Sequence, residues 1–282
     1  MTQSGSIGAA NGSRGLSRFR RAAAMIPHRP LVIPSGGLWL GPRPRVRLIA
    51  LLAARDEMQQ LPAWLRNVAP QVDGVVALDD GSSDGTGEWL SAQPEVLEVV
   101  RVPAGRPQWD EVANHRALVA AAHRHAADWA ICIDADERLE RKFRARAETV
   151  IGRGRLLGLT AYLVRLRELW GRPDRYRVDG IWGRKAVARL FRLRPDHLFD
   201  ERPLHARKTP AQARHLGRNL PLADLELYHL GVLTPERRRA RREKYERIDP
   251  QARWQPGIGY AYLTDDGDLR VRRVPARRSY VE

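Results

Sequence analysis

Cysteine is almost absent from this sequence, since Cys132 is the only one among 282 residues. No disulfide can form within the chain, and a metal centre built from several thiolates is excluded. This cysteine content fits a reducing compartment, so a cytoplasmic location is expected. The sequence also lacks any run of eighteen apolar residues, and no segment is expected to cross a bilayer as a helix.

Acidic residues are in the minority, with 33 Asp and Glu against 49 Lys and Arg. The formal net charge of +16 favours partners that carry phosphates, such as nucleotides, nucleic acid or anionic lipid head groups. The excess of basic residues therefore indicates that the partner is negatively charged but does not identify it.

The chain divides by composition into three parts. Residues 1–44 are rich in Arg, Ser, Gly and Pro, which predicts a disordered basic tail, with tethering to an anionic surface as the alternative. Residues 45–250 are expected to form one domain. Residues 251–282 are expected to be an extension, and "GYAYLTDDGDLRVRRVP" is typical of a hairpin around an Asp-Gly turn.

Strand and helix patterns alternate four times between residues 45 and 133, starting with the apolar run "RVRLIALLAA". This alternation predicts an α/β fold with a mostly parallel central sheet and helices on both faces. Beyond residue 152, "LGLTAYLVRLRELW" and "VARLFRLR" indicate further strands. Thr234-Pro235-Glu236 is typical of a helix start and precedes the basic run "ERRRARREKYERI". The second half is therefore expected to be an α+β elaboration of the same domain.

Two acidic clusters follow apolar strands in the first half. They consist of Asp79, Asp80 and Asp84, and of Asp134, Asp136 and Glu137. Ligands of open parallel sheets bind at the carboxyl ends of the strands, where both clusters are expected. Asp134 and Asp136 are two residues apart and would point the same way in an extended chain. Because like charges repel, a Mg²⁺ or Mn²⁺ ion shared with substrate phosphates would account for them. Solvated, helix-capping or arginine-paired acids remain the alternative.

Four segments together resemble the inverting family 2 glycosyltransferases, which have the A-type nucleotide-sugar-binding fold. They are "ARDE" after the first strand, "LDDGSSDGT", "DWAICIDADE" with its Asp-any-Asp pair, and "LYHLG" downstream. The resemblance covers residues 46–250. It implies a nucleotide-binding half at 45–150, an acceptor half at 151–250, and transfer of a sugar from a nucleoside diphosphate to a hydroxyl acceptor.

The resemblance also assigns roles to individual residues. It implies that Asp79 contacts the nucleotide base, that Asp80 and Asp84 shape the nucleoside pocket, that Asp134 lies near the ribose or sugar, and that Asp136 binds Mn²⁺ or Mg²⁺ with His229 nearby. Arg55 and Glu57 match the segment that lines the nucleotide site, although Asp56 stands where asparagine is more usual. Arg116 is expected to contact the substrate phosphate or Asp136, or else to be a surface arginine.

The general base is the least defined part of this prediction. Relatives often carry a His-Glu pair after the "RLFR" strand, where this chain has His205 followed by Ala206. Glu201 is the favoured replacement, together with Asp200. Asp224 and Glu226 are further alternatives.

Other classes of function remain as alternatives. One is a homologue that binds nucleotide sugars without catalysis, because the usual base is missing. Another is a basic nucleic-acid-binding protein, but the sequence contains no Cys-His finger and no RNA-recognition aromatic pair, so no nucleic acid is expected. A phosphoryl-transfer enzyme with an aspartate nucleophile is a third. The basic helix after His229 indicates peripheral contact with an anionic membrane, or else a solvated helix with internal ion pairs.

Overall fold

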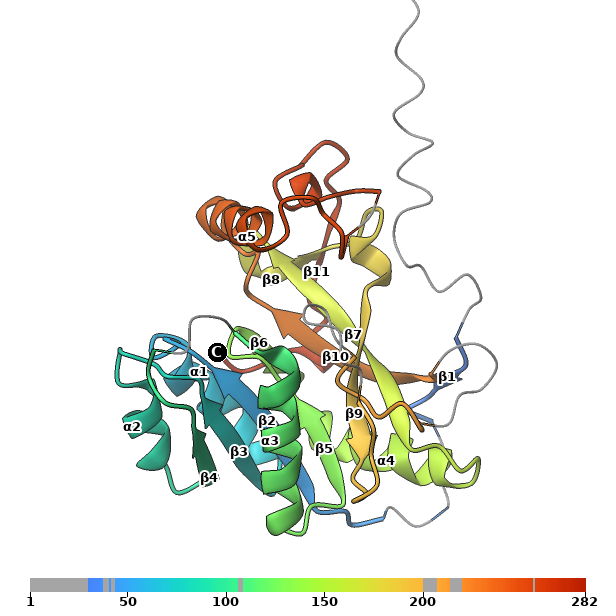
Figure 1. Cartoon of the computed structure of the whole chain (residues 1–282). Coiled ribbons are helices and arrows are strands. Elements are labelled where there is room, and N and C mark those ends of the chain that lie inside the picture. Colours follow the sequence, from blue (N-terminus) through green and yellow to red (C-terminus); the bar gives the residue numbers. More distant parts are fainter. Residues whose placement is uncertain are drawn as a thin grey trace, which may run out of the picture.

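The computed structural model describes residues 30–37, 41, 44–105, 109–199, 207–213, 220–255 and 257–282 (Figure 1). The α-helices are α1 (Leu61–Val68), α2 (Thr86–Ser91), α3 (Glu111–Arg124), α4 (Phe143–Arg155) and α5 (Pro235–Ile248). The strands are β1 (Val32–Ile33), β2 (Leu48–Ala54), β3 (Gly74–Asp79), β4 (Val96–Arg101), β5 (Trp129–Cys132), β6 (Glu137–Leu139), β7 (Ala161–Trp170), β8 (Arg172–Arg177), β9 (Ala186–Arg192), β10 (Leu222–His229) and β11 (Val271–Arg273).

The main sheet has the strand order β1-β10-β7-β9-β5-β2-β3-β4. The four strands β5, β2, β3 and β4 are all parallel, as the alternating pattern predicts. β9 is antiparallel to both β5 and β7, whereas β10 is parallel to β7. The fold is therefore α/β with a mixed, mostly parallel sheet, and the second half of the chain extends the sheet of the first.

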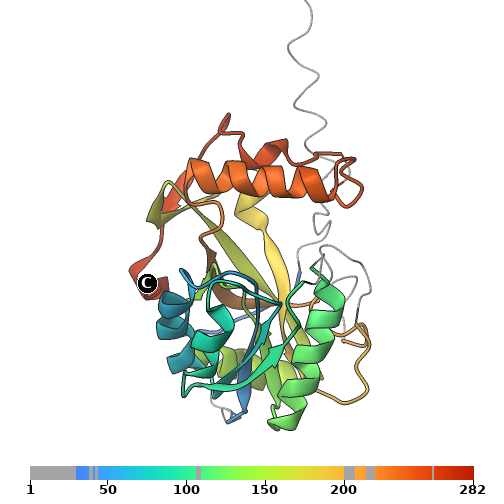
Figure 2. The same ribbon diagram turned by 60° about the vertical axis from the view of Figure 1, so that its left-hand side comes forward.

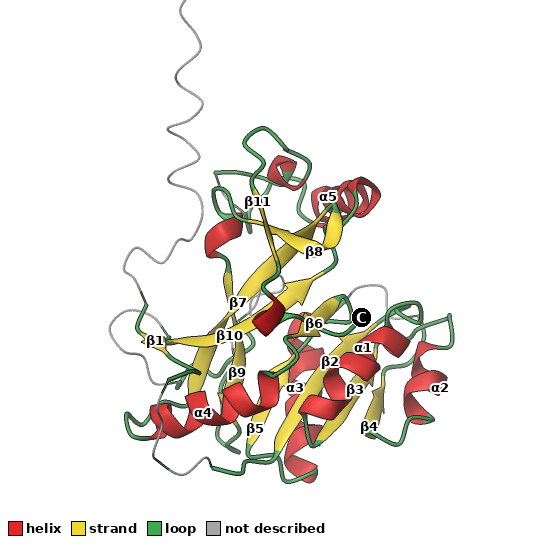
Figure 3. Ribbon diagram, turned by 180° about the vertical axis from the view of Figure 1, so that it is seen from behind, coloured by secondary structure: helices red, strands yellow, loops and turns green. Residues whose placement is uncertain are grey.

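Helices cover both faces of the parallel strands. On β2, Leu48, Ala50 and Leu52 face one hydrophobic cluster that includes residues of α1 and α4, whereas Ile49 and Leu51 face a second cluster with α3. This alternation follows from the period of two in a strand and explains why the run has no polar positions. Figure 3 shows α1 and α4 in front of the sheet and α3 behind it.

α5 lies on the side of the molecule toward which the carboxyl ends of the parallel strands point (Figure 2). Its start is as expected, since the Thr234 side chain accepts a hydrogen bond from the Arg237 backbone N–H and Pro235 occupies the first turn. Within the described ranges, no helix is long and apolar enough to cross a membrane.

The predicted hairpin in the C-terminal extension is wrong. A turn forms, with the Leu269 N–H donating to the Asp266 carbonyl, but Ala261–Leu263 form a 3₁₀ helix instead of the first strand. β11 pairs antiparallel with β8, which is itself fixed against β7. β11 therefore pairs with the exposed edge of β8. The sequence had predicted a partner in the residues just before the Asp-Gly turn.

Two terminal segments also depart from the expected organisation. Val32–Ile33 lie within the predicted disordered tail but form β1, which extends the sheet beside β10. At the other end, Tyr280 forms a β-bridge with Glu140, and the Asn67 side chain donates to the Val281 carbonyl. Both ends of the described chain are therefore part of the packed domain.

Candidate active site

Both acidic clusters meet around one side chain, Glu57, which follows β2. The strand β2 lies between β5 and β3, so the loops after these three strands are neighbours. Burial raises the pKa of Glu57 to about 7, and the negative charges of Asp136, Asp134 and Asp84 add to the rise, against the opposing charge of Lys244. Acids that are far apart in the sequence therefore converge on a common edge of the sheet.

The acids at the end of β3 are bonded to their own loop and to arginines of neighbouring segments. Asp79 accepts a hydrogen bond from the Ser82 backbone N–H at 3.1 Å and pairs with Arg101 at 3.0 Å. The Asp80 carboxylate is fully buried and pairs with Arg55 at 2.7 Å. These contacts give the loop a fixed shape and engage both carboxylates in ion pairs.

The loop after β2 is tied to the loop after β3 through backbone N–H groups. The Glu57 N–H donates to Thr86 Oγ1 and the Met58 N–H donates to Asp84 Oδ2, each at 3.0 Å. Asp56, with a positive φ of 54°, accepts a bond from the Ser83 N–H. Aspartate and asparagine both tolerate this left-handed conformation, so the change from the more usual asparagine preserves the backbone geometry.

Asp134 and Asp136 do not share one target, contrary to the prediction from an extended chain. The Glu137 N–H donates to the Asp134 carbonyl at 2.9 Å, so the segment turns between the two acids. Asp134 pairs with Arg189 at 2.6 Å and with Lys208 at 3.0 Å, while Asp136 has other partners. The turn directs the two carboxylates toward different cations.

Asp136 belongs to a chain of charged groups that runs into the interior. Asp136 Oδ2 lies 3.0 Å from His229 Nε2, and His229 Nδ1 contacts the carboxylate of Glu168, which also contacts Lys185. Burial alone would lower the pKa of His229, but Glu168 and Asp136 outweigh it and raise this pKa to about 9. Glu168 is fully buried and fixes the orientation of the imidazole.

Gly231 lies directly against the functional atoms of this chain. A Cβ atom at residue 231 would lie 2.4 Å from Asp136 Oδ2, 2.6 Å from His229 Nε2 and 2.5 Å from Arg241 Nη1, so only glycine fits here. The Asp136 oxygen and, in its neutral form, the His229 nitrogen suit a Mn²⁺ ion. No group of three or more His, Cys, Asp or Glu side chains among the described residues could hold a metal ion. Asp136 and His229 thus fit a metal that takes its other ligands from substrate phosphates and water.

Arg189 and Glu137 form the other ionic centre of the site. The Arg189 side chain is 8% exposed and bridges Asp134 to the Glu137 carboxylate, which is 1% exposed. Glu137 also accepts a hydrogen bond from the Asp134 backbone N–H at 2.9 Å. This arrangement holds Asp134 ionised, because the nearby Arg189 and Lys208 keep the pKa of Asp134 well below its usual value.

A pocket opens between the ends of β2 and β5 and the first turns of α3. Its lining includes Ala53, Trp109, His115, Asp134 and Lys208. Polar and charged side chains of Glu111, Asn114, Asp134 and Lys208 line it together with apolar and aromatic ones, so the pocket combines stacking surface with hydrogen-bonding groups. Sequence analysis did not identify Trp109 or His115 as site residues.

His115 makes this pocket sensitive to acid. Burial lowers the pKa of His115 from 6.5 to about 3, with Lys208 adding to the effect. The unfolded chain binds a proton near pH 6.5, so stability is fully present above that pH and is lost as pH falls toward 3. Between pH 7 and pH 5 we expect His115 to remove about 2 kcal/mol of the free energy of unfolding. Urea denaturation at both pH values measures this loss.

A matched pair of variants isolates the effect of His115. The pH-dependent loss should shrink by that amount in His115→Phe, whose ring suits the neighbouring Phe191 and Phe199. It should be unchanged in His123→Gln, a partly exposed position on the same helix. Equal acid sensitivity of the wild type and His115→Phe would contradict the assignment.

The remaining residues predicted for the site are on the surface, in ion pairs with arginines, or outside the described residues. Arg116 is exposed on α3, and Arg241 is the arginine found at Asp136. Glu201 and Asp200, the predicted general bases, lie outside the described residues. Asp224 and Glu226 are paired with arginines, Asp224 with Arg278 at 2.6 Å and Glu226 with Arg167 at 2.6 Å.

The site contains residues that the sequence motifs did not reveal, namely Glu168, Lys185, Arg189, Lys208 and Arg241. Glu168 lies on β7 and Arg189 lies on β9, the two strands with alternating basic residues. Glu168 is the only acid on β7. That single acid among basic residues was the available signal. Arg241 and Lys208 carried none, because basic residues are common throughout the chain.

Comparisons with known proteins give distant relatives. No family model matches the sequence. Uncharacterised proteins of Mycobacterium bovis and Mycobacterium tuberculosis are each 28% identical over 236 residues, which is 79% of this chain and 57% of theirs. A TPR repeat-containing protein of Synechococcus elongatus is 29% identical over 157 residues, which is 55% of this chain and 33% of its own. The chain therefore spans little more than half the length of the mycobacterial relatives.

Solved structures with a partly similar fold include TarS and GalNAc-T7. Residues 1–349 of TarS of Staphylococcus aureus give a TM-score of 0.43 at 12% identity, covering 71% of this chain and 65% of that chain, and TarS was also solved in complex with UDP at 13% identity. GalNAc-T7, solved with UDP, GalNAc and Mn²⁺, has a TM-score of 0.33 at 12% identity, covering 44% of this chain and 24% of GalNAc-T7.

Proposed function

We propose that this protein is a metal-dependent, inverting glycosyltransferase of the family 2 type. It moves a sugar from a nucleoside diphosphate to a hydroxyl acceptor and works in the cytoplasm. The observation that carries the proposal is the pairing of Asp136 with His229 beside Gly231, next to Glu57 and Asp134 at the carboxyl edge of the sheet. A diphosphate bound with a divalent ion at this edge would relieve the repulsion among the acids.

The residues present have distinct roles in this proposal. Asp136 and His229 would hold Mn²⁺ or Mg²⁺, which neutralises charge on the departing diphosphate when it is bound. Asp134 would accept hydrogen bonds from the ribose or sugar, because Arg189 and Lys208 keep it ionised and its side chain is 43% exposed. The pocket beside His115 and Trp109 would take the nucleobase. Asp79, Asp80, Asp84 and Arg55 would fix the loop that bounds the nucleoside, and Glu57 would face the diphosphate.

The transfer itself replaces one bond at the anomeric carbon with another. The acceptor oxygen attacks the face opposite the diphosphate, and the departing phosphate oxygen takes the electron pair of the broken bond. A base must remove the acceptor proton, and Glu201 with Asp200 remains our proposal for it. Asp224 and Glu226 are not proposed, because both carboxylates are engaged in ion pairs with arginines.

The basic helix α5 is better explained by ion pairs than by a membrane contact. Arg239 pairs with Glu236 and Arg242 pairs with Glu246 along its surface, three and four residues apart. Arg241 instead points into the site. The described contacts of α5 therefore favour a solvated helix that contributes to the active site.

A thermal-shift screen of UDP-, GDP- and dTDP-sugars with Mn²⁺ tests the proposal. A donor at about 100 times its dissociation constant stabilises the fold by about 2.7 kcal/mol. For a chain of this size the melting temperature should rise by roughly 5 °C. The shift should disappear in Asp136→Asn and persist in Asp268→Asn, which changes an exposed aspartate outside the site.

Donor hydrolysis without an acceptor, measured with and without Mn²⁺, then separates an enzyme from a homologue that only binds. Hydrolysis that requires Mn²⁺ supports a transferase. A donor that binds but is not hydrolysed, and is not transferred to any hydroxyl acceptor, would favour the non-catalytic homologue. If no nucleotide sugar shifts the melting temperature of the wild type, the proposed function is wrong.

A further inference from the structure

Arg241 projects from the middle of α5 into the junction between Asp136 and His229. Its Nη1 atom lies 3.4 Å from Asp136 Oδ2 and 3.0 Å from His229 Nε2. Arg241 therefore supplies a positive charge to the same two atoms that the proposed function assigns to a metal ion.

A metal ion bound to this pair and the Arg241 guanidinium would compete for one position. Asp136 Oδ2 and His229 Nε2 lie 3.0 Å apart, so an ion held by both would lie about 2.1 Å from each. Arg241 Nη1 already contacts both atoms, and Gly231 closes another side, since a Cβ atom there would lie 2.4 Å from Asp136 Oδ2 and 2.6 Å from His229 Nε2. A divalent cation held by the pair would therefore meet the guanidinium, and both charge and volume exclude their coexistence.

We propose that Arg241 and the divalent cation are alternative occupants of the Asp136–His229 pair, so that metal binding displaces the guanidinium. This inference rests on the proposed function for the presence of a metal. It goes further in assigning Arg241 as an internal competitor, which weakens metal binding until a nucleoside diphosphate arrives with the ion. The displaced guanidinium is then next to the diphosphate and adds its charge there.

The two ligands are held in place, so the arginine is the part that moves. The Asp136 carbonyl accepts a hydrogen bond from the Leu230 N–H at 2.8 Å, and His229 is fixed by the buried Glu168. The Arg241 guanidinium also lies 5.4 Å from the centre of the Tyr245 ring, which is one turn further along α5. Contact with this ring gives the displaced side chain a place near the site.

α5 itself has other anchors and does not depend on Arg241. The Arg237 side chain donates to the Leu230 carbonyl at 3.1 Å, and Arg238 donates to the Val232 carbonyl at 3.2 Å. Arg242 donates to Thr264 Oγ1 at 2.9 Å. The helix can therefore stay in place while one of its side chains changes partner.

Mn²⁺ binding in the absence of nucleotide tests the exchange, with free Mn²⁺ measured by its electron paramagnetic resonance signal. Arg241→Gln removes the competing charge and should bind Mn²⁺ about tenfold more tightly than the wild type, since hydrogen bonds to charged groups are worth this much or more. Arg241→Ala should behave like Arg241→Gln, and Arg241→Lys should lie between them and the wild type. Arg239→Gln, which changes an exposed arginine on the same helix, should leave the affinity unchanged.

The outcomes separate this inference from the proposed function. Unchanged or weaker Mn²⁺ binding by folded Arg241→Gln and Arg241→Ala, together with loss of binding in Asp136→Asn, overturns the exchange and leaves the metal site standing. An absence of Mn²⁺ binding in every variant also overturns the exchange, and the donor screen without metal then decides the proposed function by itself. Melting temperatures of all variants establish that the comparison concerns folded protein.

Discussion

Replacing Arg189 with methionine is expected to lower the free energy of unfolding by about 3–5 kcal/mol, the usual cost of removing one partner from a buried ion pair. The change leaves Glu137 buried without its cation and leaves Asp134 with Lys208. For a chain of this size the melting temperature should fall by on the order of 10 °C. Differential scanning calorimetry at neutral pH measures the change.

Two further variants show whether the lost charge is the cause. Arg192→Met removes an exposed arginine from the same strand and should change stability little. Adding Glu137→Gln to Arg189→Met should recover part of the loss, because the buried charge that lost its partner is gone. Equal destabilisation by Arg192→Met, or no recovery in the double variant, would show that packing and not charge explains the result.

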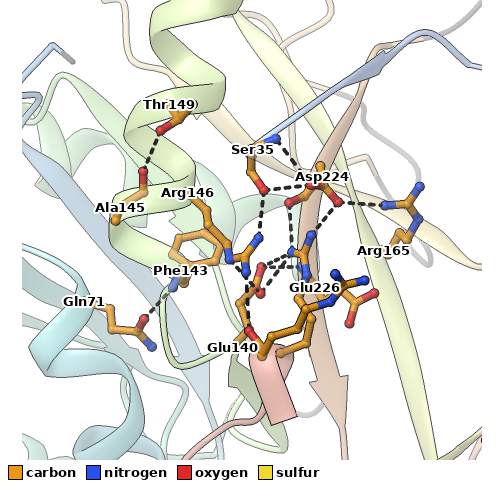
Figure 4. Close-up of polar contacts among 12 residues, drawn as sticks. Ser35, Gln71, Glu140, Phe143, Ala145, Arg146, Thr149, Arg165, Asp224 and Glu226 are labelled. Atoms are coloured by element: carbon orange, nitrogen blue, oxygen red, sulfur yellow. Dashed lines mark hydrogen bonds and ion pairs between the residues drawn. The ribbon is translucent and has the colours of Figure 1, made fainter. Parts of the chain in front are cut away.

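Replacing Arg278 with methionine should destabilise the protein by about 3 kcal/mol at neutral pH, again through a buried carboxylate left with too little positive charge. Arg278 donates to both oxygens of Glu140, which is fully buried, and also pairs with Asp224. Figure 4 shows Glu140 and Asp224 close together, with Arg146 and Ser35 beside them. Arg146 remains as a partner of Glu140 at 3.3 Å, so the loss should be smaller than for Arg189.

The loss caused by Arg278→Met should grow as the pH rises. Burial raises the pKa of Glu140 to about 7, against the opposing charges of Arg278 and Arg146. Without Arg278 this pKa rises further, so the folded chain binds a proton that the unfolded chain has lost. Urea denaturation at pH 6 and pH 8 measures this dependence. Arg277→Met, an exposed neighbour, serves as the control, and a loss that is independent of pH would contradict the role given to Glu140.

The local sequence was sufficient for the parallel half of the fold. β2, β3 and β5 are short apolar runs that end in polar turns, and α1 and α3 show apolar residues at helical spacing, so each element could be recognised by itself. The position of β9 between β5 and β7 could not be predicted in the same way. Strand pairing over such distances depends on which edges are left open, and β11 illustrates this by pairing with β8 instead of with its own neighbour.

Some residues of the candidate site could likewise be recognised from the local sequence, and others could not. Asp134 and Asp136 were recognisable because acids rarely follow a buried strand without a reason, but their partners were not. Arg189 is 55 residues from Asp134, and His229 is 93 residues from Asp136. No periodic pattern joins residues at such separations, and the abundance of arginine hides the few that are buried. The turn between the two acids depended on one backbone hydrogen bond, which the extended pattern did not reveal.

The insertion of β9 beside β5 limits how this domain can be divided. One edge of β5 pairs with β9, a strand that lies more than fifty residues later in the chain. A fragment that stopped after α4 would present an open, apolar β-edge, which is a template for association with other chains. Gene fusions that exchange one half of the domain for that of a distant relative would therefore need to carry a matching β9. The two halves therefore fold as one unit.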